Sequence, residues 1–233
     1  MIPTVVHLWT ACIDRPSGQI ARLERILSED ELTRAARYRL SVHRDRFVAG
    51  RAIRRLILAQ YLDRPPEAIR FSTGAHGKPF IDSESTDGVR FNDSDSHRLA
   101  VVAVTWGRDI GVDIERVESN PHADRIVEMF GTSSERNLYR QMPDAERALA
   151  FHRWWTAKEA WLKTVGTGLL TPLNTFTVSF SADRPLHLLD VEGDLSPVRR
   201  WTFEALSPAP GFVGTVVVDG PLGGLIQRHW TGL

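Results

Sequence analysis

The sequence predicts an α+β protein that consists of two similar α/β halves. Two observations predict this fold class. Helical periodicity is followed by short strand-like runs, and this order occurs twice along the 233 residues. In addition, the pattern of 91–104 resembles that of 203–218, which is a weak internal repeat. We therefore predict an N-terminal half over 1–107 and a C-terminal half over 108–233, with a ligand site at their junction.

The helices of the first half are marked by a cap and by apolar spacing. Ser28 and Glu31 form a capping box at the start of a helix that reaches about Tyr38. A longer helical pattern covers 47–58 and stops before Pro65. Short strands are expected at 5–9, 69–72, 89–92 and 99–105.

The second half repeats the plan. A strand is expected at 110–115, and two short amphipathic helices follow at 122–130 and 134–141. A long helix then runs from Asp144 to about Thr164 and ends at glycines. The closing strands are expected at 176–180, 186–189, 200–206 and 212–218.

Composition restricts the class of protein. Hydrophobic residues make up 42% and charged residues 25%, which is typical of a globular domain. The longest apolar run, 99–104, is too short to cross a membrane, and no secretory signal is recognised. The single cysteine, Cys12, excludes an internal disulfide and a multi-cysteine zinc site. We therefore expect a cytoplasmic protein without a membrane partner.

The basic residues are unevenly distributed. The 29 Lys and Arg balance 29 Asp and Glu, so net charge does not suggest nucleic-acid binding. Eight arginines nevertheless lie between Arg34 and Arg55 with one acid, Asp45, which predicts either a site for a small polyanion or a solvated helix face. Only three lysines are present, Lys78, Lys158 and Lys163. This selectivity hints that a compact ammonium is needed at these positions.

Two acidic residues share one face of the strand 110–115. Asp113 and Glu115 are two residues apart, so they lie about 6.6 Å apart at a rise of ~3.3 Å per residue. Val112 and Ile114 then face the core. The pair indicates either a cation site or the solvated acids of an edge strand.

The long helix supplies a third carboxylate. Glu159 and Lys163 are one helical turn apart, which alone is typical of an exposed ion pair. However, this helix carries three tryptophans and Phe151, so most of its surface is expected to be buried. With Asp113 and Glu115, Glu159 would complete a site of oxygen ligands, which suits Mg²⁺ and not zinc.

Two further segments are weak signals alone. Gly77 and Lys78 lie at a tight turn within 71–79, and a polar loop follows Phe91 over 92–96. Together the motifs G-x-D-x-E, W-x-x-K-E-A-x-x-K about 40 residues later, R-F-S-T-x-x-x-G-K-P and F-N-x-S resemble the 4′-phosphopantetheinyl transferases, in particular the Sfp type.

The resemblance implies a fold and a reaction. The fold is a monomer of two pseudo-symmetric halves, with coenzyme A bound at their junction. The reaction is transfer of 4′-phosphopantetheine from coenzyme A to a serine of an acyl or peptidyl carrier protein, with release of adenosine 3′,5′-bisphosphate. It depends on Mg²⁺, with Mn²⁺ as an alternative.

The resemblance also implies residue roles. Asp113, Glu115 and Glu159 match the metal ligands, and Glu159 also matches the base toward the serine. Lys163 matches a catalytic contact to the coenzyme A pyrophosphate. The other coenzyme contacts implied are Lys158 at the pyrophosphate, Gly77, Lys78 and Pro79 at the adenine, Arg34 and Arg46 at the 3′-phosphate, and Ser94 at a phosphate.

Two positions depart from the family pattern. Asp95 stands where the family loop usually has a phosphate-facing histidine, and Glu31 stands where relatives often have lysine. Both changes are expected to remove positive charge near the nucleotide, unless His97 or Arg98 compensates at Asp95. The departures keep open a non-catalytic coenzyme-binding module, and a phosphohydrolase is a third reading.

A docking surface for the carrier is expected after Glu115. Its apolar candidates are Ile126, Val127, Met129 and Phe130, which equally fit the core of a short helix.

Overall fold

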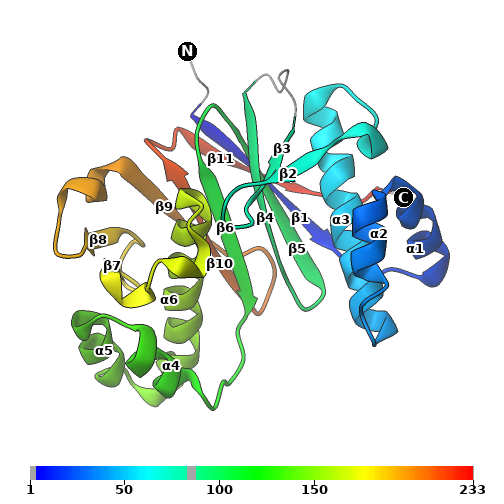
Figure 1. Ribbon diagram of the computed structural model, residues 1–233. Helices are drawn as coiled ribbons and strands as arrows, with labels where there is room; N and C mark the ends of the chain where they lie inside the picture. Colours follow the sequence, from blue (N-terminus) through cyan, green and yellow to red (C-terminus); the bar gives the residue numbers. More distant parts are fainter. Residues whose placement is uncertain (1–3, 83–87, 233) are drawn as a thin grey trace.

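The structure, a computed structural model, describes residues 4–82 and 88–232. Two sheets lie in the middle of the molecule, with α1–α3 on one side and α4–α6 on the other (Figure 1). The first sheet has the order β11-β1-β5-β4, and the second has the order β6-β10-β9. Their strands are β1 (Val5–Cys12), β4 (Val89–Ser96), β5 (Leu99–Trp106), β6 (Ile110–Arg116), β9 (Trp201–Leu206), β10 (Phe212–Asp219) and β11 (Gly224–His229). The predicted α+β class is confirmed.

Six α-helices and two small hairpin-like sheets complete the described chain. The helices are α1 (Ser17–Leu23), α2 (Glu29–Ala35), α3 (Ser41–Leu62), α4 (Ala123–Phe130), α5 (Ser133–Arg140) and α6 (Asp144–Val165). The small sheets pair β2 (Phe71–Thr73) with β3 (Pro79–Ile81), and β7 (Phe176–Val178) with β8 (Leu188–Val191). None of the described helices has the length and apolar content that a membrane span requires.

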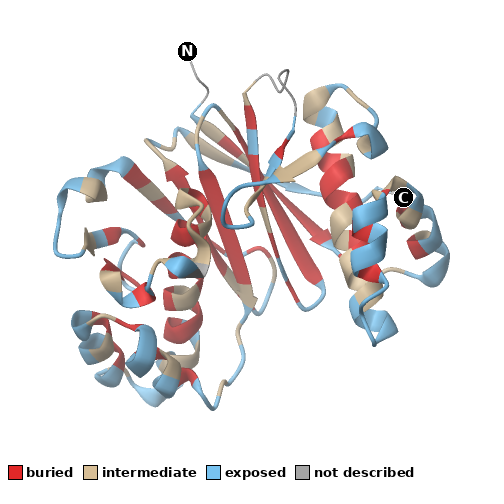
Figure 2. Ribbon diagram, in the orientation of Figure 1, coloured by how far each residue is buried: buried red, intermediate tan, exposed pale blue. Residues whose placement is uncertain are grey.

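The layers follow from which strand faces are apolar. Along β5, residues 99, 101 and 103 join the core between the two sheets, while residues 100, 102 and 104 join the core beneath α1–α3. Burial on both faces explains the uninterrupted apolar run of this strand. Figure 2 shows the buried residues concentrated in the two sheets and on the inward sides of α3 and α6.

Alternation along β6 decides where its acids point. Val112 and Ile114 are fully buried between the two sheets, as predicted. Gly111, Asp113 and Glu115 therefore lie on the opposite face, where α6 packs.

Local caps begin and end the helices. The predicted capping box is present: the Ser28 hydroxyl accepts from the Glu31 backbone N–H, and the Glu31 carboxylate accepts from the Ser28 N–H. α5 begins with a second capping box, Thr132 with Glu135, which was not predicted although T-S-S-E is a readable signal. Gly166 ends α6 in the left-handed region at φ 75°.

The C-terminal strand β11 returns to the first sheet. It pairs in parallel with β1, from Val5 with Gly224 to Thr10 with His229. Its residues are mostly exposed, and only Leu225 and Ile226 are apolar, so the segment gave no alternating strand signal and was not predicted. The division at 107/108 stays a prediction, and the segment 224–229 crosses it.

Candidate active site at the junction of the two halves

Side chains of β4 join the two sheets. The polar segment 93–96, predicted as a loop, is the second half of this strand. Its alternate side chains accept hydrogen bonds from the backbone N–H groups on the free edge of β6, which otherwise pairs only with β10. The three pairs are Val112 N to Asn92 Oδ1 at 2.8 Å, Ile114 N to Ser94 Oγ at 3.4 Å, and Arg116 N to Ser96 Oγ at 3.2 Å. The junction thus satisfies edge groups that would be costly to bury alone.

The same hydroxyls orient the two acids of β6. Ser94 Oγ donates to Asp113 Oδ1 at 2.8 Å, and Ser96 Oγ donates to Glu115 Oε2 at 2.7 Å. Each serine therefore bridges a backbone N–H and a carboxylate of the neighbouring sheet. The sequence analysis missed Asn92 and Ser96, whose signal was their two-residue spacing with Ser94 within the polar run 92–96.

Gly111 lets α6 approach the acid-bearing face of β6. A Cβ on Gly111 would lie 2.1 Å from the Ala160 carbonyl oxygen and 2.5 Å from the Thr164 nitrogen. Any larger residue would push the helix away. The glycine of the G-x-D-x-E motif is thus a packing requirement that brings Glu159 and Lys163 toward Asp113.

Lys163 binds the strand directly. Its Nζ donates to Asp113 Oδ1 at 2.8 Å and to the Val112 carbonyl at 3.1 Å. Burial alone would lower the pKa of Lys163, but Asp113 and Glu159 raise it above its usual value. The ammonium is therefore firmly protonated beside the acids.

The surroundings of the two glutamates favour their neutral forms, because the pKa of each is raised. Burial and then Asp113 raise the pKa of Glu159. Burial also raises the pKa of Glu115, with Asp113 adding to the effect and the Ser96 hydrogen bond opposing it. A cation close to these two glutamates would favour their charged forms.

A metal ion would be such a cation, although the ligands are not gathered in the structure. Across 4–82 and 88–232, no group of three or more Asp, Glu, His or Cys side chains lies close enough to hold an ion. One reason is that the Lys163 ammonium already occupies one side of Asp113. The other oxygen, Asp113 Oδ2, is buried without a hydrogen-bond partner among the described residues. This orphaned oxygen and the all-oxygen donor set fit Mg²⁺.

Two neighbouring cavities lie near Asp113, which lines the second of them, whereas Glu115 and Glu159 line neither. One, of about 400 Å³, lies between α3 and the first sheet, and the other, of about 440 Å³, lies between the β2–β3 turn and the end of α6. Their walls share Arg51, Asp93, Ser94 and Asp95. The predicted coenzyme residues on these walls are Arg34 and Arg46 in the first cavity, Gly77, Lys78, Pro79 and Lys163 in the second, and Ser94 and Asp95 in both.

Lys78 holds the turn against the C-terminal half. Its Nζ donates to the Ile110 carbonyl at 3.0 Å and to the Thr164 carbonyl at 3.1 Å. Thr164 lies in the last turn of α6, where a cation is favoured. Lys78 therefore helps to close the wall of the second cavity.

Lys158 lies outside both cavities, so the prediction of a pyrophosphate contact is wrong. Its side chain is fully buried in the C-terminal half, where Nζ lies 2.8 Å from Glu135 Oε2 and 2.6 Å from the Leu173 carbonyl oxygen. Helical geometry explains the error, because Lys158 and Glu159 are neighbours in sequence but point in different directions around α6.

Glu31 was also misplaced by the sequence analysis. It is 8% exposed and accepts from Arg54 and Arg55, so it does not remove positive charge from a nucleotide site. Asp95 does face both cavities and forms no ion pair with Arg98 or any other described residue. Burial and Asp93 raise the pKa of Asp95. His97 lines the first cavity as well, with its Nε2 3.7 Å from Glu118 Oε2.

The apolar candidates after β6 divide into two kinds. Val127 is buried in the core, and Ile126 packs against that core. Met129 and Phe130 are exposed, by 54% and 40%. Only the last two present an apolar surface.

Comparison with known proteins identifies the family. Residues 109–217 match the 4′-phosphopantetheinyl transferase superfamily, and residues 15–107 match the model described as 4′-phosphopantetheinyl transferase, N-terminal. The 4′-phosphopantetheinyl transferase HetI of Nostoc is 35% identical over 216 residues, which cover 92% of this chain and 88% of HetI. The chain belongs to the 4′-phosphopantetheinyl transferase family. Another member, Sfp of Bacillus subtilis, is 26% identical over 211 residues, which cover 90% of each chain.

Membership confirms the predicted family and shows that the protein is a transferase. A junction with oriented acids, a protonated lysine and arginine and lysine side chains in the cavity walls is suited to binding a phosphorylated substrate and transferring a phosphoryl-linked group.

Proposed function

We propose that this protein transfers 4′-phosphopantetheine from coenzyme A to a serine of an acyl or peptidyl carrier protein. The serine oxygen forms a bond to the β-phosphorus of the coenzyme A pyrophosphate. The bond from that phosphorus to the bridging oxygen breaks, and adenosine 3′,5′-bisphosphate leaves. The observation that carries the proposal is the contact of Asp113 with Ser94 and Lys163 beside two cavities with arginine and lysine in their walls, in a chain of this family.

Three carboxylates are proposed to hold Mg²⁺, or Mn²⁺ in its place. They are Asp113, through its unpartnered Oδ2, with Glu115 and Glu159. Bound there, the ion supplies positive charge that neutralises the pyrophosphate as negative charge develops.

The chain's own residues carry the other roles. Lys163 faces the second cavity and is proposed to bind the pyrophosphate as a charged donor. Glu159 is proposed to accept the serine proton, directly or through one water, for which its raised pKa suits it. Ser94 and Ser96 keep the β6 carboxylates in position.

The coenzyme is proposed to span both cavities. Gly77, Lys78 and Pro79 would line the adenine, and Arg34 with Arg46 would meet the 3′-phosphate. Near-complete coverage of Sfp supports the assignment to the Sfp type. A cytoplasmic monomer without a nucleic-acid or membrane partner completes the proposal, with the internal repeat supplying both halves of one site.

A transfer assay separates this function from its alternatives. The protein is incubated with fluorescent coenzyme A and an apo carrier protein, with and without Mg²⁺. Labelled carrier that appears only with the metal supports the proposal. Binding without transfer would indicate a coenzyme-binding module, and coenzyme A cleavage without carrier would indicate a phosphohydrolase. A panel of fatty-acid, polyketide and peptide carriers would then identify the acceptor.

A further inference from the structure

A third cavity lies in the C-terminal half, away from the junction. It is formed by α5, the first half of α6 and the segment from β7 to β8, and its volume is about 690 Å³. None of the described residues in its wall lines either cavity of the junction. A volume of this size is typical of a site for a small molecule, and the proposed function makes no use of it.

Three leucines from three elements are exposed in this cavity. Leu138 of α5, Leu149 of α6 and Leu189 of β8 are 40%, 37% and 39% exposed. A single exposed leucine is ordinary on a protein surface, whereas three that line one concave site form an apolar wall. Covering this wall would remove apolar area from water, so the cavity favours the apolar part of a ligand.

Arg153 of α6 adds a positive charge to the wall. This half-buried side chain is oriented by three carbonyl groups. Its Nε donates to the Phe180 carbonyl at 3.0 Å, and its Nη2 donates to the Ser181 and Arg184 carbonyls at 3.1 and 3.4 Å. Both N–H groups of Nη1 are left without an acceptor among the residues that the structure describes. The guanidinium therefore keeps donors for a ligand.

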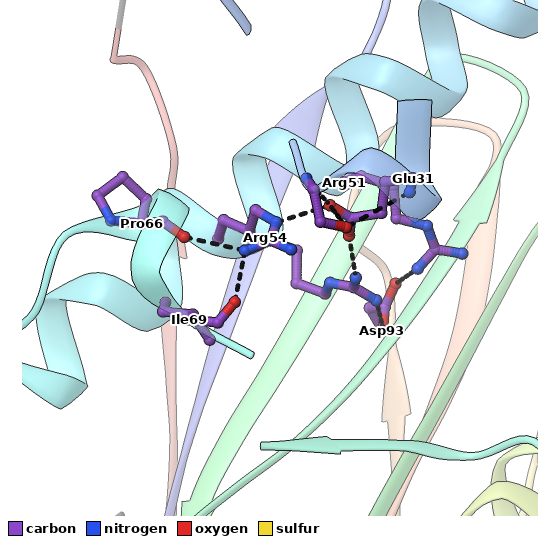
Figure 3. Close-up of polar contacts among 8 residues, drawn as sticks. Glu31, Arg51, Arg54, Pro66, Ile69 and Asp93 are labelled. Atoms are coloured by element: carbon purple, nitrogen blue, oxygen red, sulfur yellow. Dashed lines mark hydrogen bonds and ion pairs between the residues drawn. The ribbon is translucent and has the colours of Figure 1, made fainter. Parts of the chain in front are cut away.

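Arg153 lacks the counter-charge that other buried cations have. In the same described part of the chain, Arg54 pairs with Glu31 (Figure 3) and Lys158 pairs with Glu135, whereas no carboxylate pairs with Arg153. Burial lowers the pKa of the Arg153 guanidinium, because its charged form is poorly solvated. An anion beside this cation would compensate for the lost hydration.

The acids in the wall do not provide that anion. Glu135 is held by Lys158, and Asp183 lies 4.0 Å from Arg184. Glu146 is exposed, so water screens its charge, and it forms no ion pair within 4–82 and 88–232. One positive charge is therefore left uncompensated. This balance suits a ligand with a single negative charge better than a phosphate dianion.

We propose that this cavity binds a small carboxylate with an aliphatic body. Arg153 holds the carboxylate through Nη1, and Leu138, Leu149 and Leu189 pack on the aliphatic part. The occupant is a small molecule because one half-buried cation in a concave site matches one small anion, whereas a protein partner needs a much larger contact area. The site is independent of the proposed function, since it requires neither coenzyme A nor a carrier protein.

Calorimetric titration of the full chain with octanoate tests the proposal. The parent protein should bind octanoate saturably, with a dissociation constant of about 1 mM or below. Octanol, which has the body without the charge, and acetate, which has the charge without the body, should each bind at least about tenfold more weakly. Arg153→Gln should weaken octanoate about tenfold or more, because a charged hydrogen bond is lost, and should leave octanol unchanged. Equal octanoate binding by the parent and Arg153→Gln, or no saturable binding by the parent, would overturn the proposal.

The matched control is Arg147→Gln. It removes the same charge from the same helix, but Arg147 pairs with Asp124 and Asp144 and does not line this cavity. It should bind octanoate as the parent protein does. A loss as large as that in Arg153→Gln would mean that the net charge of α6, and not a specific site, attracts the anion, which would also overturn the proposal.

Leu149→Glu is a second test, because Arg153→Gln also removes three contacts to carbonyls. Leu149 is exposed and precedes Arg153 by four residues, so the introduced carboxylate lies one helical turn away and can pair with the guanidinium. It should compete with the ligand and weaken octanoate at least about tenfold. Unchanged octanoate binding by this variant would show that Arg153 only holds the carbonyls, and the proposal would be wrong. The titrations contain neither coenzyme A nor carrier, so a failure here leaves the proposed function untouched.

Discussion

Each half buries a capping-box glutamate against a cation of its long helix. In the N-terminal half Glu31 accepts from Arg54 and Arg55 of α3, and in the C-terminal half Glu135 pairs with Lys158 of α6. Both glutamates occupy the N3 position of a short helix, and both long helices have 22 residues. The two clusters thus have the same local design.

The two clusters differ in the further partners of their cations. Glu135 also accepts from the Val178 N–H, and Lys158 donates to the Leu173 and Phe176 carbonyls, so every partner is structural. Arg54, by contrast, reaches Asp93 at the cavity wall. A planar guanidinium can bridge two carboxylates, whereas a compact ammonium fits among carbonyl oxygens. The same pairing of a capping-box glutamate with a helix cation therefore has only structural partners in the C-terminal half. In the N-terminal half it extends to the cavity wall through Arg54 and Asp93.

The largest stability effect is expected at the C-terminal cluster. Lys158→Met leaves Glu135 buried without its cation, so the free energy of unfolding should fall by about 3–5 kcal/mol. The folded fraction should keep its KM for coenzyme A. Urea denaturation with transfer kinetics below the transition measures both quantities. A raised KM with full stability would mean that Lys158 acts at the site after all. Glu135→Gln combined with Lys158→Met should recover part of the loss.

Lys163 lies five residues after Lys158 on the same helix, and its substitution should affect catalysis much more than stability. Lys163→Arg should leave the melting temperature nearly unchanged but lower kcat about 10²-fold, because a planar fork does not reproduce a compact ammonium between Asp113 and the pyrophosphate. The control Arg153→Lys exchanges the same residue types on α6, where Arg153 binds the Phe180 and Ser181 carbonyls away from the two cavities of the junction. Full activity in Lys163→Arg would remove the distinction between the two lysines.

The acids of the site should destabilise the metal-free protein above acidic pH. Burial and Asp113 raise the pKa of Glu159, so the folded state holds this proton more tightly than the unfolded state does. The resulting stabilisation is complete below the unfolded pKa and is lost as the pH rises through the folded pKa. Glu159→Gln should therefore raise the free energy of unfolding at pH 7 by about 1 kcal/mol, with the gain vanishing near pH 4. Glu204→Gln, at an exposed position of β9, should show no such gain. A pH-independent difference would contradict the electrostatic cause.

The smallest effect is expected at Asp95. Asp95→His should lower KM for coenzyme A several-fold, and by more than it lowers KM for dephospho-coenzyme A, because a repulsive charge leaves the cavity wall. Comparing kcat/KM for both donors in the two proteins measures it. An unchanged donor ratio would show that Asp95 does not repel the 3′-phosphate.

Local signals predicted much of the fold. Periodicity and caps predicted α2, α3 and α6, and alternation predicted that Val112 and Ile114 face the core while Asp113 and Glu115 share the other face. β11 could not be predicted, because its partner β1 lies more than 200 residues away and only two of its residues, Leu225 and Ile226, are apolar. The segment 93–96 was predicted as a loop because its four residues are all polar. Ser94 and Ser96 are buried through contacts with β6, whereas Asp93 pairs with arginines of α3 and Asp95 is exposed.

The site was harder to predict, because side-chain direction depends on tertiary packing. Motif spacing grouped residues most of which line the two cavities, but Glu115 and Glu159 line neither, and Lys158 turns into the core. Glu31 was assigned to a nucleotide site from the family pattern. The sequence could not show that it pairs with two arginines 23 and 24 residues away. Arg51 was counted only as one of eight arginines between Arg34 and Arg55, because its ion pair with Asp93 forms where α3 meets β4.

Transfer by Asp113→Ala is the most direct test of the account. Asp113 receives the Ser94 and Lys163 hydrogen bonds and offers the unpartnered oxygen, so the proposed chemistry depends on it more than on any other side chain. With coenzyme A, Mg²⁺ and a carrier that the parent protein modifies, kcat/KM should fall about 10³-fold or more, the equivalent of several kcal/mol. The circular dichroism spectrum and the melting temperature should show an intact fold. Near-normal transfer by this variant would contradict the assignment of the active site to the junction of the two halves.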